Sequence, residues 1–177
     1  NMMTEVDILF IKQIELKYLS KIKKLFYLLA VNGTKAPNIS QLASDIETSR
    51  ATVMNYIKYL ADARLINIVY PVGQSFPKKP PMIMVHNPNL MYAIYPINVE
   101  KQELMENFFL NSLWKDHLVN SGKKSGCYVV NEKYQFKVCD AAKLSRSRFS
   151  QDLIYARYNT EVGHGNMIPL WLLGFLY

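Results

Sequence analysis

One side of a short predicted helix carries side chains that could bind nucleic acid. Arg50, Thr52, Asn55, Lys58 and Tyr59 lie opposite the apolar residues of the stretch 50–60. Arg and Lys bind phosphate oxygens, Thr and Tyr donate hydrogen bonds to them, and Asn pairs with two atoms of an adenine edge. The set is therefore typical of a helix that enters a nucleic-acid groove. The alternative is an ordinary surface helix, because such helices also carry polar residues opposite an apolar stripe.

The stretch 38–65 would position these side chains, since it predicts two short helices joined by a tight turn. Ser40 is placed to cap the first helix and Ser49 to cap the second. Glu47 occupies the turn position where the chain usually becomes left-handed, at a cost of about 1 kcal/mol. This is the pattern of a helix-turn-helix. The apolar residues expected to face the core are Leu42, Ala43, Ile46, Val53, Ile57 and Leu60.

Two β-rich runs follow, at 65–70 and 82–85, and they flank a turn-rich loop that contains Lys78 and Lys79. Two strands around such a loop would form a wing, whose lysines could contact phosphates. We therefore predict a winged helix-turn-helix domain over residues 1–95, in preference to a generic pair of helices. Winged helices also serve as protein-interaction and oligomerisation modules, so this prediction alone does not fix the ligand.

A longer helix is predicted before this motif, because the stretch 11–30 lacks Pro and Gly and has apolar residues at helical spacing. The apolar residues are Leu19, Ile22, Leu25, Phe26 and Leu29. Its polar side holds the densest basic run of the chain: Lys12, Lys17, Lys21, Lys23 and Lys24. These lysines could follow a phosphate backbone or form a solvated face.

The charge of the chain is concentrated in its first region. The 177 residues have a formal net charge of +7, which favours anionic partners. Residues 1–95 carry eleven Lys and Arg against six Asp and Glu, an excess of +5, and residues 96–177 carry ten against eight, an excess of +2. The predicted helix-turn-helix is itself neutral, with three cations and three anions, and this counts against tight DNA binding.

Residues 96–177 predict a second, small α/β domain, so the expected fold class is α+β. We expect a helix over 102–118 and a β-hairpin over 127–138 with a three-residue loop. Such a loop would place Cys127 and Cys139 opposite each other, although reduced thiols are the default in a cytoplasmic protein. The stretch 121–126 is a basic loop, and 140–161 has no clear pattern. The apolar stretch 168–177 is expected to be a buried strand or a docked tail.

No motif for a cofactor, a metal or a reaction is visible. The chain lacks both the G-x-x-x-x-G-K-[ST] phosphate loop and G-x-G-x-x-G, and His86, His117 and His164 have no partner at ligand spacing. No apolar run reaches the roughly twenty residues of a membrane span, and no export signal is visible. We therefore expect a cytoplasmic protein that is not itself an enzyme, with no membrane partner.

Several runs together resemble the C-terminal portion of the bacterial AAA-family ATPases. They are PNISQLASDIETSRATVMNYIKYLADARLINIVYP, KPPMIMVHNPNLMYAI and LMENFFLNSL. The closing run, NMIPLWLLGFLY, is similar to the terminal motif of the Bacteroidetes branch of that family. The resemblance extends from about Lys17 to Tyr177. It implies that an N-terminal ATPase domain is missing from this chain and is one of its partners.

In that family the region after the winged helix resembles a restriction-endonuclease-like fold, in which a helical acid and a strand acid hold a metal for phosphodiester cleavage. Glu106 matches the helical acid. The strand acid would fall within 134–138, where this chain has Lys137, and Asp140 is out of register. A cation at the position of a metal ligand implies an inactive, degenerate nuclease-like domain in which Glu106 is a capping or structural residue.

Two functions therefore remain open. In the first, the chain is a non-catalytic module that binds double-stranded DNA for the parent ATPase. In the second, it is a protein-interaction or oligomerisation scaffold for the ATPase domain. A metal-dependent nuclease is a third, weaker reading of the resemblance.

Overall fold

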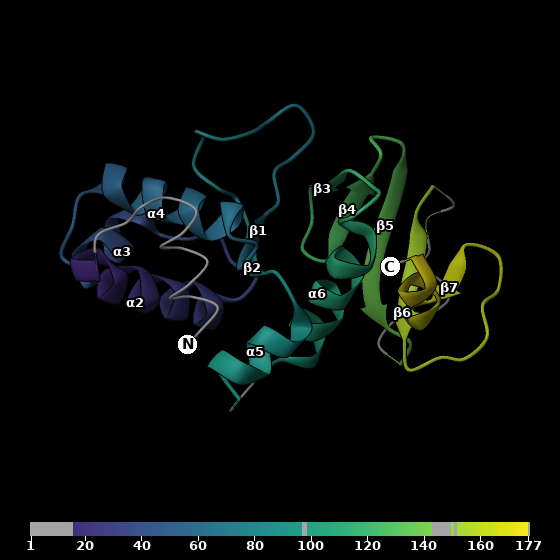
Figure 1. Ribbon diagram of the computed structural model, residues 1–177. Helices are drawn as coiled ribbons and strands as arrows, with labels where there is room; N and C mark the ends of the chain where they lie inside the picture. Colours follow the sequence, from purple (N-terminus) through teal and green to yellow (C-terminus); the bar gives the residue numbers. More distant parts are fainter. Residues whose placement is uncertain (1–15, 97–98, 143–149, 151, 177) are drawn as a thin grey trace. The chain divides into compact units, whose positions relative to one another are not determined.

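The computed structural model describes residues 16–96, 99–142, 150 and 152–176 (Figure 1). These residues form an α+β protein with two separate sheets. The chain divides into two compact units, Asn1–Val69 with Ser75–Asn98, and Tyr70–Gln74 with Val99–Tyr177. The second unit thus includes a short segment that lies, in the sequence, between the two strands of the first.

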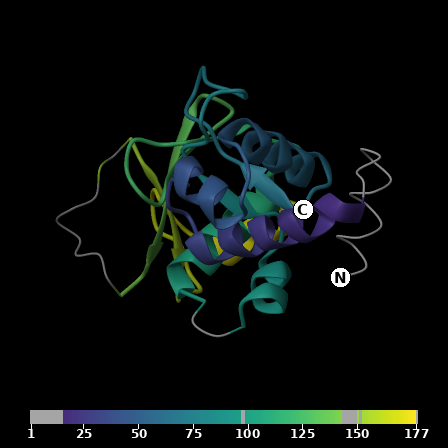
Figure 2. The same cartoon turned by 90° about the vertical axis from the view of Figure 1, so that its left-hand side faces the viewer.

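Apolar stripes at helical spacing hold the first unit together. The helices α2 (Leu16–Asn32), α3 (Ile39–Asp45) and α4 (Arg50–Asp62) lie around a common core (Figures 1 and 2). The predicted helix over 11–30 is confirmed from Leu16 onward, and its first residues lie outside the described part. The residues predicted to face the core are all buried: Leu19, Ile22, Leu25, Phe26, Leu29, Leu42, Ala43, Ile46, Val53, Ile57 and Leu60.

The caps of the two short helices are only partly as predicted. Ser49 caps α4, because its Oγ accepts a hydrogen bond from the backbone N–H of Thr52 at 3.1 Å. Ser40 is not the cap of α3, and this prediction was wrong. Asn38 has the extended backbone of an N-cap and its Oδ1 accepts from the N–H of Gln41 at 3.3 Å, so Ser40 already lies within the helix. In the turn, Glu47 has a φ of +51°, which confirms the left-handed position.

The two β-rich runs pair as an antiparallel two-stranded sheet. β1 (Ile66–Ile68) and β2 (Ile83–Val85) are in register with Ile66 opposite Val85, and the N–H of Val69 extends the pairing to the carbonyl of Met82. Most of these side chains are buried, so the sheet completes the core that the helices begin. The helix α5 (Pro88–Ile94) follows, capped by Asn87.

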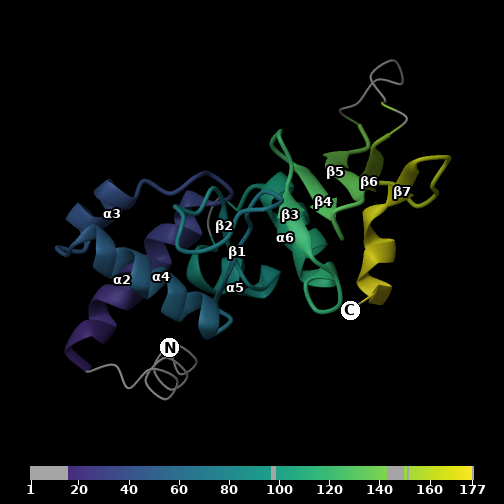
Figure 3. The same cartoon turned by 90° about the horizontal axis from the view of Figure 1, so that it is seen from above.

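The second unit contains a five-stranded mixed sheet in the order β3-β4-β5-β6-β7 (Figure 3). The first three strands are antiparallel neighbours, whereas β5, β6 and β7 are parallel. The predicted hairpin is confirmed with its three-residue loop, since Val130 pairs with Tyr134. The strands are β3 (Val119–Ser121), β4 (Cys127–Val130), β5 (Tyr134–Asp140), β6 (Ile154–Tyr158) and β7 (Met167–Pro169).

The helix α6 (Lys101–Leu113) packs on one face of this sheet and ends five residues earlier than predicted. Phe109 of α6 is fully buried, with its ring centroid 5.1 Å from that of Tyr128 and 5.4 Å from that of Phe136. The apolar end of the chain combines both expected forms, because β7 is followed by the short 3-10 helix η2 (Leu170–Leu176), which packs against α6. Within the described residues, no helix has the length and apolar character needed to cross a membrane.

Candidate functional site

The outer face of α4 presents three of the five side chains that the sequence singled out on this helix. Arg50, Asn55 and Lys58 are exposed. Thr52 is half-buried, and its Oγ1 lies 2.8 Å from Oγ of Ser49, so its hydroxyl takes part in the helix cap. Tyr59 is also half-buried, with its ring 6.2 Å from that of Tyr56. The exposed cations and the amide therefore form the accessible part of this face.

The loop between β1 and β2 approaches the same face of α4. Nζ of Lys58 lies 5.5 Å from the centroid of the Phe76 ring, close enough for a cation–π interaction. Lys78 and Lys79 follow Phe76 in the loop and are both exposed. The structure thus links α4 to the loop that carries the two lysines. This contact could not be predicted from the sequence, because an isolated aromatic residue in a loop predicts no partner.

Two of the lysines on α2 bind the turn between α3 and α4. Nζ of Lys21 donates to the carbonyl of Glu47 at 2.6 Å, and Nζ of Lys24 donates to the carbonyl of Asp45 at 2.6 Å. These carbonyls lie at or just after the C-terminal end of α3, where helix carbonyls lack partners and cations are stabilising. Lys21 and Lys24 therefore support the helix-turn-helix geometry, a role that neither sequence interpretation included.

His86 stabilises the base of the two-stranded sheet. Its Nδ1 lies 2.8 Å from Oδ1 of Asn67, which is buried. Burial lowers the pKa of His86, and the nearby charge of Arg64 lowers it further. The neutral imidazole is therefore the favoured form. Among the described residues, no three His, Cys, Asp or Glu side chains are grouped so that they could hold a metal ion.

Glu106, the residue matched to a nuclease acid, lies in a buried polar network of the second unit. Its side chain is 2% exposed. Tyr128 donates from its hydroxyl to Oε2 at 2.7 Å, and Gln102 donates from Nε2 to Oε1 at 2.7 Å. Gln102 in turn accepts from the Tyr158 hydroxyl at 2.9 Å. Burial raises the pKa of Tyr128 well above its ordinary value, and the Glu106 carboxylate raises it further.

Glu106 and Lys137 do not face each other. Phe136 packs on α6 through Phe109, and alternate residues of a strand point to opposite faces, so Lys137 lies on the face away from α6. The two positions that the resemblance would bring together around a metal are thus separated by the sheet. The hydrogen bonds of Glu106 support the structural role expected for it.

The prediction that Cys127 lies opposite Cys139 was wrong. Because Val130 pairs with Tyr134, counting along both strands places Lys137 opposite Cys127. Both thiols are free, as the default predicted. Burial raises the pKa of each thiol, although nearby cations act in the opposite direction.

The fold and this surface define an α+β protein whose first unit presents cations from a helix and a neighbouring loop. Residues 3–88 match the model of a family described as a domain of unknown function (DUF8612), and this range includes α2, α3, α4, β1 and β2. No curated protein and no solved structure matches the chain. The helical unit and its sheet are thus similar to a recognised family whose description names no activity.

Proposed function

We propose that the first unit is a winged helix that binds double-stranded DNA, with α4 in a groove and the loop between β1 and β2 on the phosphate backbone. The observation that carries this proposal is the contact of Lys58 with Phe76, because it links the loop to the outer face of α4. A reading helix and an adjacent basic loop are the two contact elements of this class of DNA-binding module.

Each exposed residue then has a distinct role. Arg50 and Asn55 would contact base edges, because their side chains can make paired hydrogen bonds with guanine and adenine. Lys58, Lys78 and Lys79 would contact phosphates and so position the helix. The half-buried Thr52 and Tyr59 would contact the backbone at the margin of the interface.

The resemblance to the AAA-family ATPases extends this proposal to the whole protein. This chain would be the non-catalytic C-terminal part of such an ATPase, and its first unit would engage the DNA on which the ATPase domain acts. The absence of a phosphate loop from the sequence agrees with a division of labour in which another domain binds the nucleotide.

A salt-titrated binding assay tests the proposal. Fluorescence anisotropy of a labelled duplex should show binding by the wild-type chain that weakens with salt. Lys78→Ala/Lys79→Ala should weaken this binding and reduce the slope of log K against log salt by about 2. Lys115→Ala/Lys133→Ala is the matched control, since it removes two exposed lysines from the second unit. Equal affinities for the wild type and the Lys78/Lys79 variant would refute the proposal.

A specific observation also favours the second candidate function, an interaction scaffold for the ATPase domain. The 3-10 helix η2 buries Leu170 and Leu173 but leaves four large apolar side chains exposed: Trp171, Leu172, Phe175 and Leu176. An exposed apolar cluster of this kind is typical of a protein-binding surface. Light scattering that shows only monomers, together with no binding to the isolated ATPase domain, would exclude this function.

We expect no magnesium-dependent cleavage of the duplex. Both oxygens of the Glu106 carboxylate accept hydrogen bonds, and Lys137 occupies the expected ligand position on the other face of the sheet. Cleavage that is lost in Glu106→Gln would contradict this expectation and support the nuclease reading.

A further inference from the structure

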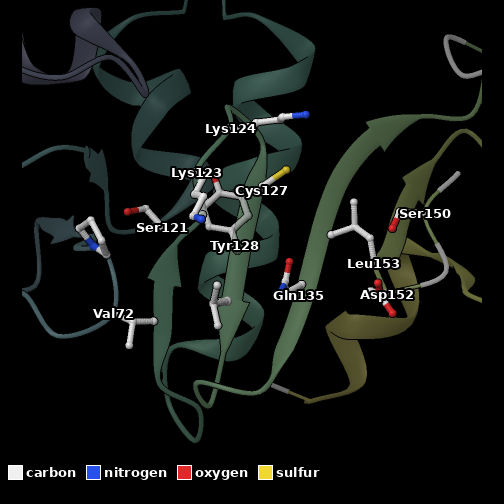
Figure 4. Close-up of a pocket in the computed structure, with 13 residues that line it drawn as sticks. Val72, Ser121, Lys123, Lys124, Cys127, Tyr128, Gln135, Ser150, Asp152 and Leu153 are labelled. Carbon is white, nitrogen blue, oxygen red and sulfur yellow. The ribbon is translucent and has the colours of Figure 1, made fainter. Parts of the chain in front are cut away.

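The second unit contains a cavity that none of the functions above uses. Its volume is about 600 Å³, within the usual range for small-molecule sites (Figure 4). Part of its wall is formed by Cys127, Val129 and Gln135. Because successive residues of a strand point to opposite faces, these three lie on the face of the sheet away from α6. The loop between β3 and β4 contributes Lys123 and Lys124.

Tight backbone geometry fixes the loop that carries these lysines. The N–H of Gly122 donates to the carbonyl of Cys127 at 2.8 Å, and the N–H of Cys127 donates to the carbonyl of Lys124 at 3.1 Å. A Cβ at Gly122 would lie 2.8 Å from Cβ of Cys127 and 2.9 Å from its backbone, so only glycine fits there. Gly126 has a φ of +71°, a conformation that side chains rarely adopt. The backbone that carries Lys123 and Lys124 therefore has a defined conformation.

A second wall is fixed by the segment Tyr70–Gln74. The carbonyl of Tyr70 accepts hydrogen bonds from the N–H of Ser121 at 2.9 Å and from Nδ2 of the buried Asn120 at 3.1 Å. These bonds hold Pro71 and Val72 beside β3, where both line the cavity. The cavity therefore has an apolar wall in Pro71 and Val72, next to a backbone segment held by hydrogen bonds to β3.

The lining divides into a cationic part and an apolar part. Lys123 and Lys124 are exposed at the loop, while Val72, Val129 and Leu153 supply apolar surface. Burial raises the pKa of the Cys127 thiol and the Glu106 carboxylate acts in the same direction, whereas the charges of Lys137 and Lys124 lower it. Among the described residues of the lining, Asp152 is the one carboxylate, and in Figure 4 it lies on the side away from the two lysines.

We propose that this cavity binds an organic phosphate, a phosphate monoester on an apolar or planar body. Lys123 and Lys124 would bind the doubly charged phosphate, for which lysine is a common partner. The apolar residues Val72, Val129 and Leu153 would contact the organic part. A neutral ligand would leave the two lysines unused, inorganic phosphate would leave the apolar part unused, and a carboxylate would supply one negative charge to two cations where a phosphate monoester supplies two. The proposal concerns the second unit and does not rest on DNA binding by the first.

Isothermal titration calorimetry on the full chain tests this site with adenosine 5′-monophosphate as the probe. We expect saturable binding that weakens about tenfold or more in Lys123→Ala/Lys124→Ala, because charge-assisted hydrogen bonds are lost. The control Lys115→Ala/Lys133→Ala should bind the probe within about twofold of wild type. Gln135→Glu, a substitution of equal size at an exposed strand position, should also weaken binding by adding a negative charge.

Three results would overturn the proposal: no saturable binding of the monophosphate, an equal loss in both double variants, or adenosine or inorganic phosphate binding as tightly as the monophosphate. A single-stranded oligonucleotide with a 5′-phosphate separates two sources of the same chemistry. Measured in the Lys78→Ala/Lys79→Ala background, which removes proposed DNA contacts of the first unit, tighter binding of this oligonucleotide than of the monophosphate assigns the site to a strand end, and weaker binding assigns it to a free nucleotide. Lys78→Ala/Lys79→Ala should leave monophosphate binding unchanged, which distinguishes this test from the test of DNA binding.

Discussion

The two helices α4 and α6 have equal length but differ in whether their polar side chains are exposed or buried. Each spans 13 residues. The residues that α4 buries are Val53, Tyr56, Ile57 and Leu60, and its charged and amide side chains point outward. By contrast, α6 buries Glu106, Asn107 and Ser112 together with its apolar residues. Arg50, Asn55 and Lys58 of α4 are therefore exposed, whereas Glu106 of α6 accepts hydrogen bonds from groups of the same unit.

This difference teaches why a residue type alone does not identify a site. Glu106 has the chemistry of a metal ligand, yet its two oxygens accept hydrogen bonds from Tyr128 and Gln102. A buried carboxylate without such partners would cost several kcal/mol. On α6, the hydrogen bonds to Glu106 are needed because this carboxylate is buried. The exposed polar side chains of α4 need no such partners, because water can solvate them.

The largest change in stability should follow from removing the hydrogen bond between Tyr128 and Glu106. Tyr128→Phe removes the donor to Glu106 without changing the packing, so we expect the free energy of unfolding to fall by about 1–3 kcal/mol. Chemical denaturation measures this change. Tyr134→Phe is the control, because Tyr134 is 46% exposed and should change stability by less than about 0.5 kcal/mol. Equal losses in both variants would show that the network contributes nothing.

A smaller effect is expected at the start of α4. Ser49→Ala removes the cap of the helix and should lower the free energy of unfolding by about 1 kcal/mol. Ser40→Ala should change it by less than about 0.5 kcal/mol, because Ser40 is exposed within α3 and is not its cap. Thermal unfolding of the two variants measures the difference. A larger loss for Ser40→Ala would restore the capping role first expected for it.

The smallest effect should be a gain in stability at the turn before α4. Glu47→Gly relieves the left-handed backbone and should raise the free energy of unfolding by about 0.5–1 kcal/mol. As a control for the intrinsic effect of glycine, Ala51→Gly at an exposed position of α4 should lower it by a similar amount. A loss of stability in Glu47→Gly would mean that the Glu47 side chain makes a contribution larger than the backbone strain.

The same contrast explains which parts of the structure the sequence could predict. The apolar residues of α2, α3 and α4 recur at helical spacing, and the β-rich runs are separated by a loop with strong turn signals. These local patterns predicted the helices, the Ser49 cap and the pairing of β1 with β2. The left-handed backbone of Glu47 was predicted because Glu47 occupies the position of a helix-turn-helix turn where glycine is usual.

The second unit was less predictable because its geometry depends on partners far apart in the sequence. Glu106 is buried by contacts with Tyr128, which is 22 residues away. β6 lies in a stretch without a clear pattern, and its parallel pairing with β5 and β7 leaves no short-range signal. The basic loop at 121–126 was visible, but the cavity beside it requires Val72 from a distant part of the chain. Contacts of this kind cannot be read from spacing.

The assignment of Tyr70–Gln74 to the second unit has a consequence for how this protein can be divided. The polypeptide passes from one unit to the other three times, after Val69, after Gln74 and after Asn98. A cut after residue 95 therefore leaves five residues of the second unit in the first fragment, and it removes Asn120 and Ser121 from the carbonyl of Tyr70. Any exchange of one unit for a homologous one would need to replace that five-residue insert as well.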